Sequence, residues 1–80
     1  MEEIVSNSVS VSAEMSAAVW KVEIAVGERV AVGDVLVLLE SMKMEIPVEA
    51  PSAGVVVEVR VVPDQSVQEG DILVVIDVSA

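Results

Sequence analysis

The sequence contains no cysteine, no histidine, no phenylalanine and no tyrosine, and Trp20 is its only aromatic residue. Without cysteine the chain can form neither a disulfide nor a thiolate metal site, and a reducing cytoplasm is permitted. Without histidine it lacks the commonest general base and the commonest metal ligand. Catalysis or metal binding that depends on these side chains is therefore excluded.

Basic residues are also scarce, with four against 14 acidic residues, and the net charge is −10. This charge disfavours nucleic acids and anionic membranes as partners. It would attract a basic protein surface, and it also keeps a small apolar domain in solution. No apolar run approaches the ~18 residues of a membrane span, and Met1-Glu2-Glu3 lacks the basic start of a signal peptide. We therefore expect a cytoplasmic protein without a membrane segment.

Valine is abundant, at 21 of the 80 residues, and 54% of the chain is hydrophobic. β-Branched residues at this density favour strands, and 80 residues make one small domain. Alternating or continuous apolar segments between turn residues predict strands over 9–13, 18–26, 35–39, 46–50, 57–61 and 72–76. Pro47 lacks a backbone donor, which places its strand at a sheet edge. We expect a flexible leader over residues 1–8 and a single small domain over 9–80.

The chain consists of two similar halves. A shift of 37 residues without a gap matches 13–40 to 50–77 with 8 identities in 28 positions, including Gly33-Asp34 on Gly70-Asp71. Neither half could bury its apolar face alone, so the halves must pack on each other. The sequence thus predicts an all-β fold: a flattened eight-stranded antiparallel barrel or sandwich (a barrel-sandwich hybrid) with quasi-two-fold symmetry.

The segment Glu40-Ser41-Met42-Lys43-Met44-Glu45 joins the last strand of the first half to the first strand of the second. In the quasi-two-fold arrangement, the equivalent last and first strands are the ones next to the two chain termini, where no segment joins them. We therefore expect Lys43 on a hairpin tip, opposite both termini. The turn contains no Gly, Asn, Asp or Pro, and it carries two methionines, which adapt to varied contact surfaces. These features favour a hairpin tip that another protein contacts. The alternative is a lysine that only prevents the strand edge from pairing with another chain.

Glu40-Ser41-Met42-Lys43-Met44 resembles the Glu-Ala-Met-Lys-Met motif of biotin carboxyl carrier proteins, within the biotinyl/lipoyl attachment domain family. Segments 30–36, 50–56 and 67–73 are similar to that family's pattern, and the resemblance covers residues 9–77. It looks closest to short stand-alone biotin/lipoyl attachment proteins.

The resemblance implies a non-catalytic carrier with covalent biotin on Lys43, attached by a biotin–protein ligase. The biotinyl-lysine would carry an activated carboxyl group from a biotin carboxylase to a carboxyltransferase, as in an acyl-CoA carboxylase of fatty acid biosynthesis. A lysine amine is a poor nucleophile while it is protonated. Since the chain has no histidine or cysteine, activation must come from the ligase.

The resemblance also implies roles for the neighbours of Lys43. Met42 and Met44 match methionines that distinguish biotin acceptors from lipoyl acceptors, and Glu40 matches a position that the ligase recognises. We assign Ser41, which replaces the usual Ala, and Glu45 to the same recognition surface. We expect a monomer without a metal ion.

Two other functions stay open. One is a lipoyl acceptor of a 2-oxoacid dehydrogenase or glycine-cleavage system, against which Met42 and Met44 argue. The other is an unmodified β-barrel interaction domain. Paired catalytic carboxylates are disfavoured, because the acidic residues fall mainly on turns and outward strand positions. The family's first-half glycine is Ala17 here while Gly54 is kept, so the turn at Ala17 should do without a positive φ or be strained.

Overall fold

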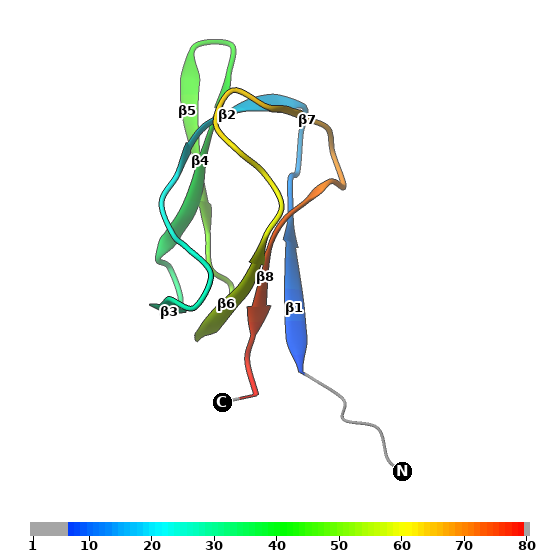
Figure 1. Ribbon diagram of the computed structural model, residues 1–80. Helices are drawn as coiled ribbons and strands as arrows, with labels where there is room; N and C mark the ends of the chain where they lie inside the picture. Colours follow the sequence, from blue (N-terminus) through cyan, green and yellow to red (C-terminus); the bar gives the residue numbers. More distant parts are fainter. Residues whose placement is uncertain (1–6, 80) are drawn as a thin grey trace.

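Two four-stranded antiparallel sheets face each other in the computed structural model, which describes residues 7–79 (Figure 1). The strands are β1 (Ser8–Ser12), β2 (Ala17–Val22), β3 (Arg29–Val30), β4 (Val35–Ser41), β5 (Met44–Glu49), β6 (Gly54–Val59), β7 (Ser66–Val67) and β8 (Ile72–Asp77). One sheet has the order β1-β8-β6-β3 and the other β5-β4-β2-β7. The predicted all-β fold of eight strands is confirmed. Within residues 7–79 there is no helix of the length and apolarity that a membrane crossing requires.

The 37-residue repeat of the sequence is also the symmetry of the structure. It superimposes β2 on β6 and β3 on β7 residue for residue, and it converts one sheet order into the other. Hydrogen bonds between loops repeat in the same way: the Ala13 amide donates to the Asp71 carbonyl at 2.9 Å, and the Ala50 amide donates to the Asp34 carbonyl at 2.8 Å. The predicted quasi-two-fold relation between the halves is confirmed.

The core lies between the two sheets and receives equivalent residues from both. Leu36 and Leu39 of β4 are matched by Leu73 and Ile76 of β8, and all four are at most 1% exposed. Among the described residues no polar or charged side chain is buried. The core is thus held by aliphatic packing alone, and each half covers the apolar face of the other.

Several strand limits differ from those predicted. The strand expected over 57–61 runs over Gly54–Val59, and the strand expected over 18–26 ends at Val22. The first shift arises because Gly54 pairs with Val30 of β3, so the ladder begins inside the predicted turn. β5 is an edge strand, as Pro47 predicted. Of the predicted leader, residues 1–6 lie outside the described residues, and Ser8 begins β1.

Ala17 and Gly54 occupy equivalent positions at the starts of β2 and β6, and neither has a positive φ. The expectation that Ala17 does without a positive φ is confirmed. At Gly54 a Cβ would meet the Asp77 carbonyl oxygen and would lie 2.6 Å from the Ile76 Cγ2. The glycine therefore permits close approach of β6 and β8 and serves no special turn geometry.

Candidate functional site

Lys43 lies at the tip of the β4–β5 hairpin. The last paired residues are Ser41 and Met44, so the loop contains only Met42 and Lys43. The hairpin projects at the end of the molecule opposite the outer ends of β1 and β8, which lead to the termini (Figure 1). The predicted position of Lys43 is confirmed.

Both residues of the turn have left-handed backbone angles, with φ 54° at Met42 and φ 66° at Lys43. A two-residue loop with two positive φ values is the type I′ turn that matches the twist of a hairpin, and Asn-Gly is its preferred sequence. An L-residue other than Gly, Asn or Asp adopts this conformation at a cost of about 1–2 kcal/mol. Two such residues in one turn indicate that their side chains serve a purpose other than turn stability.

The side chains of the tip extend into solvent. Met42 is 90% exposed, Met44 is 66% exposed, and Lys43 is exposed as well. Between residues 7 and 79 the single ion pair joins Arg60 to Glu58, so no carboxylate within that range pairs with the Lys43 ammonium. The amine is thus presented to whatever protein approaches this end of the domain.

Glu40 and Glu45 face each other directly across β4 and β5, one rung below the turn. Both are exposed, and like charges in this arrangement destabilise a hairpin. Under the repeat, Glu40 corresponds to Asp77. There the Ser79 hydroxyl and amide donate to the carboxylate at 2.6 and 2.9 Å and hold the Asp77 pKa below its usual value. The acidic pair beneath Lys43 has no such donor among the described side chains.

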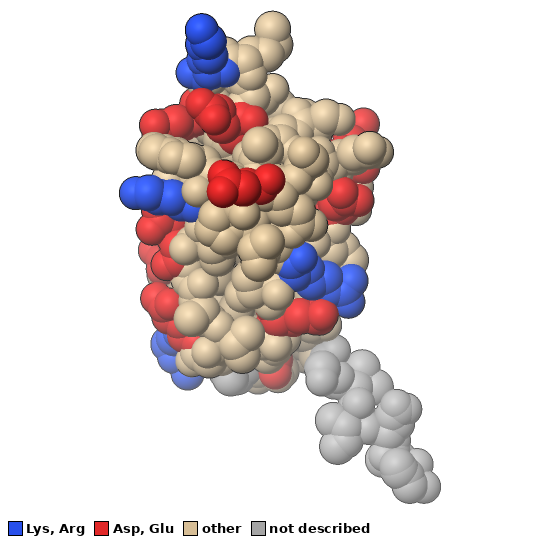
Figure 2. Space-filling view, turned by 45° about the horizontal axis from the view of Figure 1, so that its top comes forward, with Lys and Arg blue, Asp and Glu red and all other residues tan. Residues whose placement is uncertain are grey.

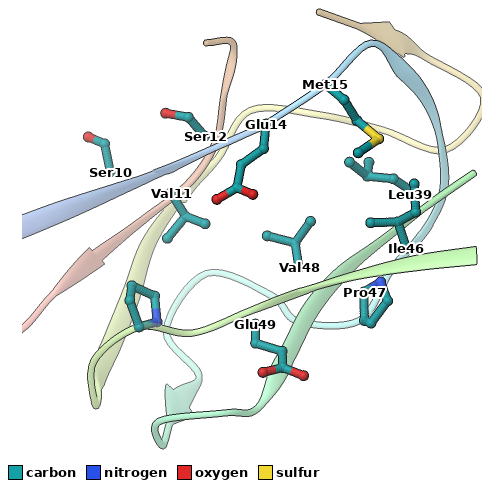
Figure 3. A pocket seen from close by; sticks show the side chains of 11 residues that line it. Ser10, Val11, Ser12, Glu14, Met15, Leu39, Ile46, Pro47, Val48 and Glu49 are labelled. Atoms are coloured by element: carbon teal, nitrogen blue, oxygen red, sulfur yellow. The ribbon is translucent and has the colours of Figure 1, made fainter. Parts of the chain in front are cut away.

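A pocket of about 330 Å³ lies between the edge strands β1 and β5, away from the tip. Figure 3 shows Val11, Leu39, Ile46 and Val48 lining it, and its walls include no lysine. Across residues 7–79 no three carboxylates gather as a metal site would require. The candidate site is therefore an exposed amine on a projecting turn, and this pocket does not contain it.

The six residues singled out from the sequence, Glu40 to Glu45, all lie in the turn or in the two rungs beside it. This geometry suits a lysine that another protein modifies. The model of the family described as biotin-requiring enzyme matches residues 2–76. The chain belongs to this family.

Relatives of comparable length are biotin attachment proteins. A biotinylated protein TB7.3 homolog of Mycobacterium leprae is 52% identical over 66 residues, which are 82% of this chain and 93% of that protein. The biotin/lipoyl attachment protein of Bacillus subtilis is 42% identical over 64 residues, 80% of this chain and 88% of the relative. Their similarity extends over the barrel as well as the hairpin.

Among solved structures, a single-chain, multi-domain long-chain acyl-CoA carboxylase superimposes with a TM-score of 0.86 at 32% identity. The match covers 100% of this chain and 8% of that one. The fold is therefore that of a biotin carboxyl carrier domain, which is a non-catalytic attachment domain.

Sequence reasoning missed one exposed residue near the hairpin. Apolar–polar alternation over residues 20–24 puts Lys21 and Glu23 on the outer face, where both are exposed, but Trp20 is exposed too, at 42%. A β-bulge between Val19 and Lys21 puts two consecutive residues on the outer face. The same bulge occurs 37 residues later, between Val56 and Glu58.

Proposed function

We propose that this chain is a biotin carboxyl carrier and that Lys43 is the residue which a biotin–protein ligase acylates. The observation that supports this most directly is the geometry of the tip: an exposed lysine stands on a two-residue turn, flanked by exposed Met42 and Met44. The family match and the biotinylated relatives give the chemical nature of the group.

The domain holds Lys43 exposed at the tip of the hairpin, and its partner enzymes carry out the chemical steps. No histidine or cysteine exists to deprotonate the Lys43 amine, so the ligase must supply an activated biotin and the base. Once attached, biotin supplies an atom that accepts an activated carboxyl group. The rigid barrel keeps the modified lysine projecting from the hairpin, and tethering raises the effective concentration of the group at each partner.

The partners follow from the proteins in which this domain recurs. The match covers only 8% of the acyl-CoA carboxylase chain named above, and we propose that separate subunits carry out carboxylation and carboxyl transfer. We propose a cytoplasmic biotin carboxylase and a carboxyltransferase that acts on an acyl-CoA. Glu40, Ser41 and Glu45 would be contacted by the ligase.

A lipoyl acceptor uses the same fold and is the second candidate. Met42 and Met44 favour biotin, because they resemble the residues beside the lysine of biotin acceptors. The names of the relatives cover both groups: one is called a biotinylated protein and one a biotin/lipoyl attachment protein. The identity of the adduct therefore decides between the two.

The test is the intact mass of the chain expressed in its own host, with parallel streptavidin detection. We expect one biotinyl adduct on wild-type protein and on Lys21→Arg, and none on Lys43→Arg. Lys21 lies on β2 and is the only other lysine, which makes its variant a matched control. Streptavidin binding by Lys43→Arg would exclude the assignment of the site. A lipoyl adduct, or no adduct in a host with active ligases, would exclude the carboxyl carrier function.

A further inference from the structure

The repeat gives an internal comparison for the outer faces of the two sheets. Residues that the fold alone requires should resemble their counterparts 37 positions away, since both halves build the same scaffold. On the outer face of the hairpin's sheet, three apolar residues have smaller counterparts on the other sheet. Trp20, Leu38 and Pro47 are matched on the other sheet by Val57, Val75 and Ser10.

Trp20, Leu38 and Pro47 form one patch, named the flank patch below. Leu38 pairs with Lys21 of β2 on one side and with Pro47 of β5 on the other, so these residues share a face. That face is the outer one, because Val37 and Leu39 on either side of Leu38 are buried in the core.

The bulge of β2 brings Trp20 to the same face. Trp20 is the extra residue between Val19 and Lys21. The Lys21 ammonium lies 5.1 Å from the centroid of its ring, an attraction that holds the indole beside the strand. The ring is still 42% exposed, whereas a tryptophan that served only the fold would bury more of its apolar area. The equivalent bulge carries Val57, which shows that the scaffold does not need an aromatic ring at this position.

The flank patch is continuous with the Lys43 hairpin. Glu40 lies two residues beyond Leu38 on the same face of β4, with Glu45 directly opposite. The turn that carries Lys43 follows at once. One face of the sheet thus presents, in order, the acceptor lysine, an acidic pair and an apolar patch with an exposed indole.

We propose that the flank patch is a docking surface for the biotin–protein ligase, with Trp20 as its anchor. This inference rests on the function proposed for Lys43. The lysine stem is short, so an enzyme that acts on the bare Nζ must press against the hairpin itself. A specific interface covers about 800 Å² on each partner, roughly a sixth of the 4998 Å² surface, and a two-residue turn cannot supply that area.

The chemistry of the patch defines the complementary surface. Tryptophan is among the residues enriched in energetic hot spots, which cluster near the centre of an interface. Glu40 and Glu45 lie between Trp20 and Lys43 and would attract basic residues at the rim of the partner's surface. This attraction would also raise the association rate. The ligase should therefore present an apolar pocket for the indole, bordered by Lys or Arg. The biotinyl-lysine arm is longer than the unmodified lysine side chain, so partners that bind the biotin can lie farther from the barrel and need not contact Trp20.

The test compares initial rates of biotinylation of the full chain by its ligase. Trp20→Val installs the residue of the equivalent bulge and so preserves the fold, which far-UV circular dichroism checks. We expect kcat/KM for the carrier to fall about tenfold or more, mainly through KM, as the loss of a hot spot predicts. Val57→Ala removes exposed apolar area from the equivalent position of the other sheet and is the matched control, expected within about twofold of wild type.

Unchanged kinetics for Trp20→Val would overturn the inference, and so would an equal loss for Val57→Ala. Slower carboxylation of the biotinylated variant with unchanged ligase kinetics would assign the patch to the carboxylase instead and would also overturn it. Absence of biotinylation in the wild-type chain would overturn the function proposed for Lys43, which distinguishes the two failures. A second measurement needs no variant: 5-fluorotryptophan gives this chain a single ¹⁹F resonance, whose chemical shift should change when unlabelled ligase is added.

Discussion

Met42 and Lys43 are the residues at which local backbone preference and structure disagree. Each adopts a left-handed conformation that favours Gly, Asn or Asp. Met42 gains almost no burial in return, because 90% of its side chain is exposed. The stability that this backbone conformation costs the domain is consistent with selection of Met42 and Lys43 for contact with another protein.

Replacing Met42 with Asn should therefore stabilise the isolated domain. Asn tolerates the left-handed region and loses no buried contact here, so we expect the free energy of unfolding to rise by about 0.5–1 kcal/mol. Urea denaturation measures this change. Met44→Asn is the control: Met44 lies in β5 without a positive φ, and Asn disfavours strands, so stability should fall. Equal effects of the two substitutions would contradict the role of turn strain.

At the scale of elements, the start of β6 leaves no room for a side chain beside β8. Gly54 begins β6 where a Cβ would run into the Asp77 backbone of β8, yet the equivalent residue at the start of β2 is Ala17. The two halves thus share a topology, while a side chain is present at this position in one half and absent in the other.

Gly54→Ala should destabilise the domain by about 2 kcal/mol or more, because the new methyl lies against backbone that cannot rotate away. Thermal unfolding followed by circular dichroism measures the loss. The reverse change at the equivalent position, Ala17→Gly, should cost less than about 1 kcal/mol, the usual entropic penalty of glycine in a strand. A Gly54→Ala variant as stable as wild type would show that β6 can move away from β8 freely.

The sequence predicts the strands and their symmetry because both follow from apolar periodicity and from the register of the repeat. It also places Lys43 correctly, since the join between the halves can lie only at the end opposite the termini. The bulges are not predictable in this way. A bulge shifts the alternation by one residue, so residues 20–24 indicated Lys21 as outward but gave no sign that Trp20 would be outward too.

One detail of the turn and one of the glycine could not be predicted from the sequence. Residues 41–45 lack turn formers, so nothing in them signals that Met42 and Lys43 take positive φ. Gly54 suggested backbone freedom, whereas its function depends on the distance to β8, which a sequence does not contain. The register of β4 with β5 decides the first feature, and the approach of β8 to β6 decides the second.

At the scale of the whole molecule, repulsion among negative charges lowers the stability of the folded state. The net charge is −10, and Figure 2 shows acidic side chains spread over the visible face with few basic groups between them. Within residues 7–79 the one ion pair, Arg60 with Glu58, has both side chains about half exposed, and such pairs contribute little. Compaction therefore brings like charges together with scarcely any pairing to offset them.

Added salt should consequently stabilise the domain at pH 7. Raising NaCl from about 10 mM to about 150 mM shortens the Debye length from about 30 Å to about 8 Å, so repulsion among the carboxylates weakens and the urea midpoint should rise.

Glu45→Gln removes the charge that faces Glu40 across the hairpin. It should raise stability at low salt by a few tenths of a kcal/mol, up to about 1 kcal/mol, and reduce the dependence on salt. A midpoint that falls with salt would mean that attractive pairs outweigh the repulsion, and an unchanged salt dependence in Glu45→Gln would place the repulsion elsewhere than at the Lys43 hairpin.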